Sequence, residues 1–459
     1  MTRIFALFAL VALTACADVT LPLSDFAGRR DTSPSTLPAM KTFATARPAR
    51  PARSNAALAK DFLDLAFMLE SGRTLPVLTR FEGPVTIRVT GRPPAGLNRD
   101  LGKLLARLRS EAGIDITQVS PGTAASITVE VVPRGKLQRA VPQAACFVVP
   151  RISSWDEFRR NRRGALTDWT TLQVRERMAI FIPGDVAPQE VRDCLHEEVA
   201  QSLGPLNDLY RLSDSVFNDD NFHTVLTGFD MLILRAFYAP ELQSGMTRAE
   251  VAAKLPAVLA RINPAGQNKR RAVRADTNRD WIDAIESALG PSISSSGRRA
   301  AAKRAVAIAK REGWNDNRLA FSLFALGRLT LSSDPDLALA SFLHSGSIYA
   351  ARSDTHLHAA HVSMQLAAFA LSAGDAEAAI SIVDANAPIV ERSENAALLA
   401  TLLMVKAEAL DLTERAAEAR VVRTEALGWA RYGFGADRVV RARVSEIAAL
   451  SPRRGRVPL

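Results

Sequence analysis

Three polar side chains on one predicted helix have the types and the spacing that could hold a metal ion and activate a water molecule. Glu197, Glu198 and Gln201 lie within about one helical turn, in the run 194–208 that reads CLHEEVAQSLGPLND. Side-chain oxygens one turn apart can bind the same ion, and a neighbouring carboxylate can take a proton from the bound water. This spacing predicts metal-assisted hydrolysis with Glu198 as general base. The structural alternative is a pair of glutamates on a solvated helix face.

The same frame resembles the helix of the zinc proteases called zincins. In them H-E-x-x-H supplies two ligands and a base, and an extended form adds x-x-G-x-x-H. In this chain Glu197 and Gln201 take the two ligand positions, and Asn207 or Asp208 takes the third. Gln is a poor ligand for Zn²⁺, so we expect a hard, oxygen-seeking divalent metal here or none at all.

Two histidines near the motif are the remaining candidate metal ligands. A register that makes His196 the first ligand puts Ala200 at the second position, and alanine cannot coordinate an ion. At about 100° per residue, His196 falls on the opposite flank of the helix from the glutamates. His223 ends a second polar run, residues 218–223, within reach of a folded-back chain. We therefore expect the glutamates and the glutamine to act as a unit, with the two histidines as auxiliary groups.

Both strands and helices are needed to position this motif. Pro188 near its start and Gly204 at its end are the expected punctuation of a helix. Apolar or alternating runs predict strands at 85–89, 127–131 and 178–182. The last of these runs leads into the motif helix. Residues 56–262 are therefore predicted to form an α+β domain.

Within this region the chain is similar to the bacterial DUF2927 family, many of whose members are described as lipoproteins. The motif itself carries the resemblance, together with the run 215–230, which contains SVFND, FHT and GFD. The resemblance covers about residues 56–245. It implies a zincin-like fold for the α+β domain. Because the family has no established activity, the resemblance implies no particular reaction.

The first residues predict export and lipidation. Residues 1–15 form a signal peptide, with a positive start at Arg3 and an apolar core, and Leu13-Thr14-Ala15-Cys16 has the pattern of a bacterial lipobox. Cys16 is expected to become the lipidated N-terminus that binds the membrane. The alternative is an ordinary cleaved signal with an incidental cysteine. Lipidation places the chain in the cell envelope facing the periplasm, and at the outer membrane if the source is Gram-negative.

The two remaining cysteines fit an oxidising compartment. Cys146 and Cys194 are an even number of thiols in an exported protein, so we expect them to form a disulfide. The bridge would close a loop of roughly fifty residues and stabilise the fold by about 3–4 kcal/mol. It would also attach the motif helix to the neighbouring apolar segment 144–149.

Composition marks the other regions of the chain. Residues 16–55 are rich in Pro, Ala and Arg and predict a disordered tether, and residues 263–297 predict a basic and Ser-rich linker with a short helix. Residues 298–459 are helical in pattern, and small residues recur 41 and 40 positions apart at Ala338, Ala379 and Ala419. This repeat resembles tetratricopeptide (TPR) arrays. The predicted fold class is an α+β zincin-like domain followed by an all-α helical-repeat (TPR-like) domain.

The net charge and two missing sequence motifs limit the classes of function that remain. The chain carries a net charge of +10, but an exported protein does not meet nucleic acid, so we expect no nucleic-acid partner. The phosphate-binding GxxxxGK[ST] loop and the GxSxG elbow are both missing from the sequence. Three histidines at positions 356, 358 and 361 are expected to be solvated.

Two functions remain. The first is a protein-interaction module, in which the helical repeats bind a protein or peptide partner and the degenerate motif only completes the fold. The second is a metal-dependent hydrolase of an envelope protein or peptide, with Glu198 as general base. The missing histidine ligands favour the first.

Overall fold

The chain folds into two compact units. The computed structural model describes residues 37–44, 51, 53–142, 144–267, 276–290 and 293–452. One unit comprises residues 44–276, and the other combines the segment up to residue 43 with residues 277–459. The predicted signal peptide and the lipidation site Cys16 lie outside the described residues. None of the helices in the described part of the chain has the length and apolar character needed to cross a membrane.

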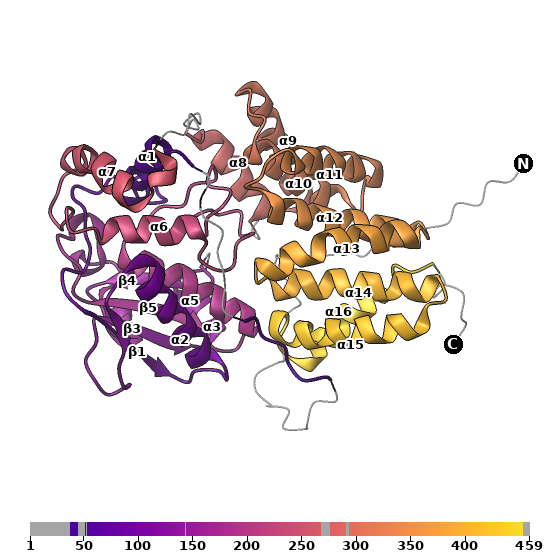
Figure 1. Cartoon of the computed structure of the whole chain (residues 1–459), viewed down its shortest axis with the longest axis horizontal. Helices are drawn as coiled ribbons and strands as arrows, with labels where there is room; N and C mark the ends of the chain where they lie inside the picture. The colour runs from indigo at the N-terminus through magenta and orange to yellow at the C-terminus, as the bar shows by residue number, and fades with distance from the viewer. Residues whose placement is uncertain are drawn as a thin grey trace, which may run out of the picture. The chain divides into compact units, whose positions relative to one another are not determined.

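The first unit is built on a five-stranded mixed sheet (Figure 1). Its strands are β1 (Val85–Gly91), β2 (Ile116–Gln118), β3 (Ile127–Val132), β4 (Phe147–Pro150) and β5 (Met178–Pro183). Their order is β2-β1-β3-β5-β4; β4, at one edge, is antiparallel to β5, and the other neighbours are parallel. The three strands expected from the sequence are thus confirmed as β1, β3 and β5.

Helices cover both faces of this sheet. Such cover is expected because every residue of β5 is buried, and successive side chains of a strand point to opposite faces. Met178, Ile180 and Ile182 of β5 join the larger core, whereas Ala179 and Phe181 join a smaller core on the other face. The smaller core includes side chains of α3 and α4, and the larger one includes side chains of the remaining helices of the unit. The helices are α1 (Asn55–Ala66), α2 (Leu97–Arg107), α3 (Arg134–Ala140), α4 (Trp155–Asn161), α5 (Pro188–Leu203), α6 (Gly228–Phe237) and α7 (Arg248–Ile262).

The motif helix α5 follows β5 directly and has the predicted limits. Pro188 is its first residue, and Gly204 follows its last. Gly204 is required by close packing, because a Cβ atom there would lie 2.8 Å from the ring of Phe237. The apolar sector expected to face the core is buried, as its members Val191, Leu195, Val199, Ser202 and Leu203 show.

All the regular secondary structure among the described residues of the second unit is helical (Figure 1). They are α8 (Arg279–Leu289), α9 (Ser295–Arg311), α10 (Asn317–Thr330), α11 (Pro335–Ala350), α12 (His356–Ser372), α13 (Ala376–Arg392), α14 (Ala396–Leu412), α15 (Ala416–Gly433) and α16 (Asp437–Ala448). Helices α11, α13 and α15 begin at residues 335, 376 and 416, which reproduces the repeat of about 40 residues read from the sequence. The recurring alanine is the fourth residue of each, and it is fully buried in all three.

Two regions assigned by composition to the linker or to solvent are packed instead. Helix α8 is the short helix expected within residues 263–297, but it belongs to the helical unit, where Trp281 is fully buried and its indole N–H donates to Ser322 Oγ at 2.9 Å. The expectation of solvated histidines is wrong for His358 and His361, which are 0 % and 3 % exposed. Both lie on the side of α12 that packs into the unit, and composition alone does not reveal which side that is.

Candidate functional site: an acidic pocket

A pocket of about 610 Å³ opens beside the motif helix. Residues from α5, from the segment leading into β4, from the turn after α1 and from the loop after α5 line it. Five of them carry carboxylates: Glu70, Glu197, Glu198, Asp208 and Asp219. We call this site the acidic pocket. It brings together four of the residues predicted from the sequence, because Gln201 also lines it.

The two glutamates of α5 lie close together at the wall of the pocket. One side-chain oxygen of Glu197, one of Glu198 and the sulfur of Cys146 all lie within 4.8 Å of one another. The sulfur cannot serve as a thiolate ligand, because Cys146 is bonded to Cys194. The predicted disulfide is therefore confirmed, with the two Cα atoms 5.9 Å apart.

The local electrostatics disfavour ionisation of these carboxyl groups. Burial, with the nearby charges of Asp219 and Glu70, raises the pKa of Glu197 to about 8. Burial and the charge of Glu197 raise the pKa of Glu198 well above its usual value. The pKa of Asp208 is likewise raised well above its usual value, by burial first and then by the neighbouring acids. At neutral pH the pocket must therefore retain protons or take up positive charge.

Glu198 is the most constrained of these acids. Its side chain is only 3 % exposed, and its buried Oε2 atom has no hydrogen-bond partner among the described residues. The buried Oδ1 atom of Asp208 also has none. Buried carboxylate oxygens normally accept hydrogen bonds, and leaving one unsatisfied costs about 1–3 kcal/mol or more for a charged group. Such atoms at the wall of a pocket indicate a ligand.

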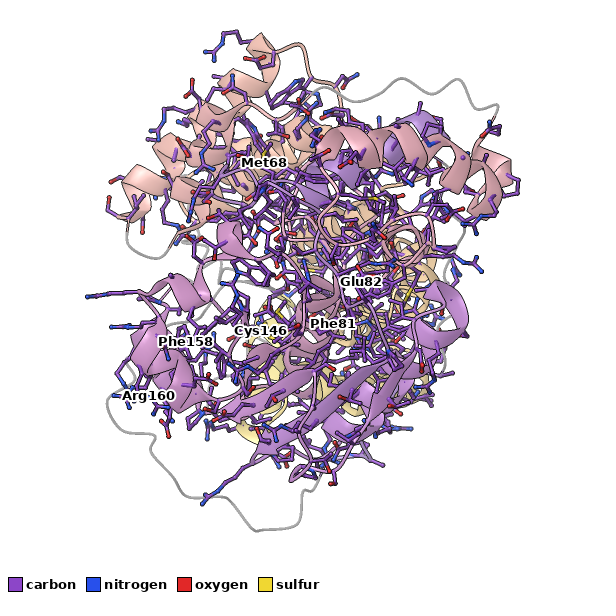
Figure 2. The ribbon with its side chains drawn as sticks, turned by 90° about the vertical axis from the view of Figure 1, so that its left-hand side faces the viewer. Met68, Phe81, Glu82, Cys146, Phe158 and Arg160 are labelled. Carbon is purple, nitrogen blue, oxygen red and sulfur yellow. A yellow bond between two sulfur atoms is a disulfide. The ribbon has the colours of Figure 1, made fainter. Side chains whose placement is uncertain are left out.

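Covalent and polar contacts hold α5 at the pocket. The disulfide joins its Cys194 to Cys146, the residue before β4, and Phe147 of β4 packs against Phe158 of α4 at a ring distance of 5.1 Å. Cys146 and Phe158 are labelled in Figure 2. At the other end of α5 the buried Arg175 donates to the backbone oxygens of Gln201 and Gly204. A cation there also interacts favourably with the helix dipole.

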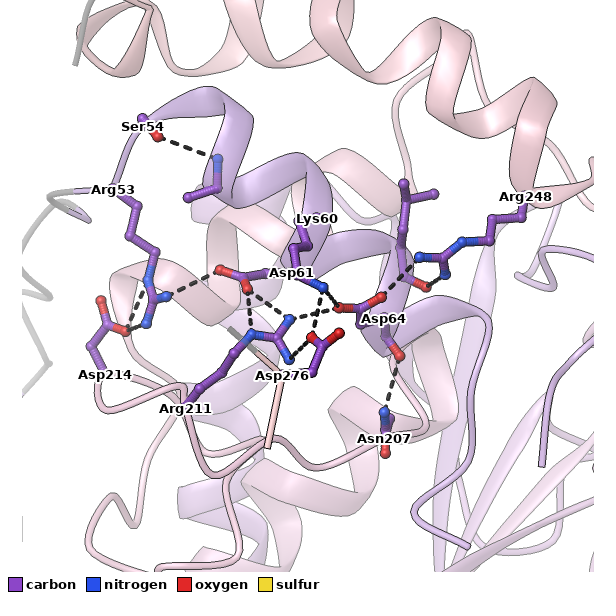
Figure 3. A network of polar contacts seen from close by, with 12 residues as sticks. Arg53, Ser54, Lys60, Asp61, Asp64, Asn207, Arg211, Asp214, Arg248 and Asp276 are labelled. Atoms are coloured by element: carbon purple, nitrogen blue, oxygen red, sulfur yellow. Dashed lines mark hydrogen bonds and ion pairs between the residues drawn. The ribbon is translucent and has the colours of Figure 1, made fainter. Parts of the chain in front are cut away.

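The loop after α5 is attached to α1 by a network of ion pairs (Figure 3). Arg211 of the loop donates to Asp61 and Asp64 of α1 at 2.9 and 2.8 Å. Asn207 donates to the backbone oxygen of Asp64 at 3.1 Å. Because Asp208 is the next residue, this network determines where an acid of the pocket lies.

The two histidines do not join the acidic pocket. His196 is buried on the other side of α5, where its Nδ1 accepts the backbone N–H of Leu226 at 3.1 Å. Burial, with the charge of Arg192, lowers its pKa well below the usual value. His223 Nε2 lies 3.1 Å from the backbone oxygen of Ser213. Both were predicted as auxiliary ligands, and neither lines the pocket because each is held by the backbone of the loop.

Two carboxylates of the pocket were not among the predicted site residues. Asp219 lies in the polar run 218–223 noted in the sequence, so part of its signal was visible. Glu70 sits in the turn after α1, about 130 residues before the motif, and contributes to the raised pKa of Asp208. No local pattern marks Glu70, because only the folded chain brings that turn to the pocket.

Zinc, the metal of the zincin helix, does not fit these residues. The two histidine positions of that motif hold Glu197 and Gln201, the nearby cysteine is in a disulfide, and both candidate histidines are elsewhere. A set of carboxylate and amide oxygens suits hard cations such as Ca²⁺, Mg²⁺ or Mn²⁺. Any reaction at this site would therefore have to proceed without a histidine-bound zinc.

Comparison with known proteins agrees with the resemblance read from the motif. No curated protein and no solved structure matches the chain. One family model matches, over residues 55–257, and its description is "Protein of unknown function (DUF2927)". The matched residues include all five carboxylates of the acidic pocket and both cysteines of the disulfide. The α/β region that carries the pocket is therefore similar to the DUF2927 family over residues 55–257.

Proposed function

We propose that this chain is an envelope-anchored protein-interaction module whose helical unit binds a peptide segment of a partner protein. The α/β unit in this proposal has a zincin-like fold and a motif helix without zinc ligands. The helical unit is of the TPR type, and stacked helical repeats commonly provide long surfaces for peptides. Support for the fold type comes from the strand β5 leading into α5 and from the 40-residue spacing of the helices.

The observation that carries the proposal is a peptide segment already docked on the helical unit. Residues 37–43, which we call the strap, lie against α15. Phe43 is 7 % exposed and stacks on Trp429 with ring centroids 4.4 Å apart. Lys41 pairs with Glu425 at 2.7 Å, and its backbone N–H donates to the Gly428 oxygen at 3.0 Å. The composition of residues 16–55 predicted a tether, but this part of it is packed.

The surface under the strap is shaped for a main chain. A Cβ atom at Gly428 would lie 3.1 Å from Cγ of Lys41 and 3.2 Å from the backbone oxygen of Ala39. Arg431 donates to the backbone oxygen of Pro38 at 2.8 Å. An aromatic anchor together with backbone hydrogen bonds is the usual way in which a peptide is recognised. A helix of the repeat unit thus recognises a non-helical segment of chain.

A peptide with the strap sequence LPAMKTF tests this function. In the full chain the attached strap competes at a high effective concentration, so wild-type protein should bind the labelled peptide weakly. A Phe43→Ala variant should bind it at least about tenfold more tightly, because one buried aromatic side chain contributes more than 1.4 kcal/mol. Binding is measured by fluorescence anisotropy.

The matched controls are two further substitutions in the Phe43→Ala background. Trp429→Ala should abolish peptide binding, whereas Leu343→Ala, at an exposed apolar position of α11, should leave it unchanged. If the Phe43→Ala variant fails to bind the peptide even at millimolar concentration, the helical unit is not a peptide-binding surface at this position.

The envelope location rests on the lipobox sequence. With Cys16 lipidated, the anchor would lie 21 residues before the strap, at position 37. A Cys16→Ser variant should move from the membrane fraction to the soluble fraction of the envelope. If it stays in the membrane fraction, lipidation is not what attaches the chain.

A second candidate, metal-dependent hydrolysis of an envelope protein or peptide, is favoured by one observation. Glu197, Glu198, Gln201 and Asp208 line the same pocket, as the motif frame predicts. A general base must be ionised, and the raised pKa of Glu198 means that it needs a positive charge nearby. Purified protein supplied with Mn²⁺ and envelope peptides tests this candidate by mass spectrometry. Cleavage that is lost in a folded Glu198→Gln variant would make it the preferred function.

A further inference from the structure

The acidic pocket holds more negative charge than its own residues can compensate. Five carboxylates line it, and the described residues that line it include no lysine, arginine or histidine. Carboxylates that are close together and partly removed from water repel one another and lose hydration. A pocket that only completed the fold would be more stable with apolar or amide side chains in these positions. The acids therefore indicate a positively charged ligand.

Glu198 provides independent evidence for that ligand. It is 3 % exposed, it lines the pocket, and its Oε2 has no hydrogen-bond partner in the described part of the chain. Because Glu198 lines the pocket, a partner for this oxygen has to come from what the pocket contains. Glu197, one residue before it, places an oxygen within 4.8 Å of an oxygen of Glu198.

We propose that the acidic pocket binds a hard divalent cation, with Ca²⁺ as the reference ion, through the carboxylates of Glu197 and Glu198. Ca²⁺ takes six to eight oxygen ligands at about 2.3–2.6 Å, so two oxygens on one ion lie no more than about 5 Å apart. The Glu197 and Glu198 oxygens satisfy this limit. Glu70, Asp208 and Asp219 line the same pocket and are available to add negative charge around the ion.

The size and the chemistry of the pocket agree with such an ion. A volume of about 610 Å³ leaves room for water molecules, which complete the coordination of hard cations. Sulfur and imidazole ligands, which favour zinc or copper, are not offered to the pocket by its described lining residues. This site goes beyond the peptide-binding function and does not involve the strap, so each can fail without the other.

Thermal unfolding of the full chain, with and without Ca²⁺, tests the proposal. In EDTA no free divalent cation is available to the acids of the pocket. Ca²⁺ at about one hundred times its Kd should raise the midpoint of the α/β unit by about 5–10 °C. Glu198→Gln should instead raise the midpoint in EDTA, because it removes a buried acid that has no partner in the protein, and it should abolish most of the Ca²⁺ effect. This opposite pair of changes is not expected from a purely structural glutamate.

A matched control removes one negative charge elsewhere on the same unit. Glu176 is exposed and lies outside the acidic pocket, so Glu176→Gln should respond to EDTA and Ca²⁺ as the wild type does. Equilibrium dialysis with ⁴⁵Ca²⁺ should find about one ion per chain in the wild type and in this control. Glu197→Gln serves as the second pocket variant if Glu198→Gln does not fold.

Three results would overturn the proposal. The first is a wild type that neither binds Ca²⁺, Mg²⁺ or Mn²⁺ nor changes its midpoint at about 10 mM of each. The second is equal binding by the wild type and the folded pocket variants. The third is a response to Zn²⁺ alone, or to free arginine and not to metal ions, which would assign a different ligand to the pocket.

Discussion

Two groups of carboxylates in the α/β unit differ in whether cations of the protein lie beside them. In the network of Figure 3, Asp61 and Asp64 of α1 are paired with cations. In the acidic pocket, Glu198 and its neighbours face one another without a cation among the described lining residues. Consecutive residues of one loop take part in the two sites, because Asn207 contacts α1 and Asp208 lines the pocket.

The ionisation of the two groups differs accordingly. Burial alone would raise the pKa of Asp64, but hydrogen bonds from Lys60 and Arg248 and the charge of Arg211 lower it. For Glu198 burial and the charge of Glu197 act in the same direction, and the pKa rises well above its usual value. A carboxylate paired within the fold stabilises the structure, whereas one that is left unpaired at a pocket is available to a ligand.

The largest expected effect is the loss of the central cation of the network. Arg211→Met leaves Asp61 and Asp64 without their buried partner, which should lower the free energy of unfolding by about 3–5 kcal/mol. Urea denaturation measures it. Arg248→Met is the matched control, because that arginine also pairs with Asp64 but its side chain is 47 % exposed, and it should cost no more than about 1 kcal/mol. Equal costs would mean that burial is not what distinguishes the network.

The disulfide should come next. Replacing Cys146 and Cys194 together with serine releases α5 from the segment before β4, and it should cost about 3–4 kcal/mol for a bridge between residues 48 positions apart. Urea denaturation of the double variant and of oxidised wild type measures this cost. As a control, the urea midpoint of the double variant is compared with that of reduced wild type. If the two midpoints differ by more than the error of the measurement, the serines themselves have changed the packing and the cost cannot be assigned to the bridge.

Asp230 is a third kind of buried acid, compensated by hydrogen bonds and not by cations. It accepts from the hydroxyl of Ser215 and from the backbone N–H groups of Val216 and Thr227. Burial outweighs these bonds and raises its pKa to about 6. The folded state then binds a proton that the unfolded state has released. The contribution of Asp230 to stability is therefore complete below about pH 4 and is lost as the pH rises to about 6.

One pKa unit corresponds to about 1.4 kcal/mol, so this loss amounts to roughly 3 kcal/mol. Urea midpoints at several pH values, for the wild type and for Asp230→Asn, measure it. The asparagine variant should show a flatter dependence between about pH 4 and 6, because its amide does not titrate. An unchanged slope would mean that Asp230 is ionised throughout this range.

The smallest effect compares the same chemical change at the two sites. In EDTA, Glu198→Gln should stabilise the protein by about 1 kcal/mol, because it removes a buried acid that must take up a proton when the chain folds. Asp64→Asn should destabilise it by about 1–3 kcal/mol, because it removes the charge that three cations share. Thermal unfolding of both variants gives the two signs. Changes of the same sign would remove the distinction between the sites.

Much of the local structure could be predicted from the sequence, because it depends on neighbours along the chain. The limits of α5 follow from Pro188 and Gly204, and its buried side follows from the helical period. The 40-residue repeat was visible as recurring alanines. The packing of α8 and of the strap was not predicted, because a segment of ordinary composition packs only if a distant surface complements it. Trp281 donates a hydrogen bond to Ser322, and Phe43 stacks on Trp429.

For the candidate site, the sequence by itself determined that two glutamates and a glutamine share one flank of a helix, and that two cysteines were available to join. Only the tertiary structure decided which distant groups meet them. It placed Glu70 and Asp219 in the pocket, and it turned His196 and His223 toward the backbone of the loop. The physical reason is that helical spacing is fixed by local geometry, whereas convergence of charges depends on a loop held by ion pairs to α1.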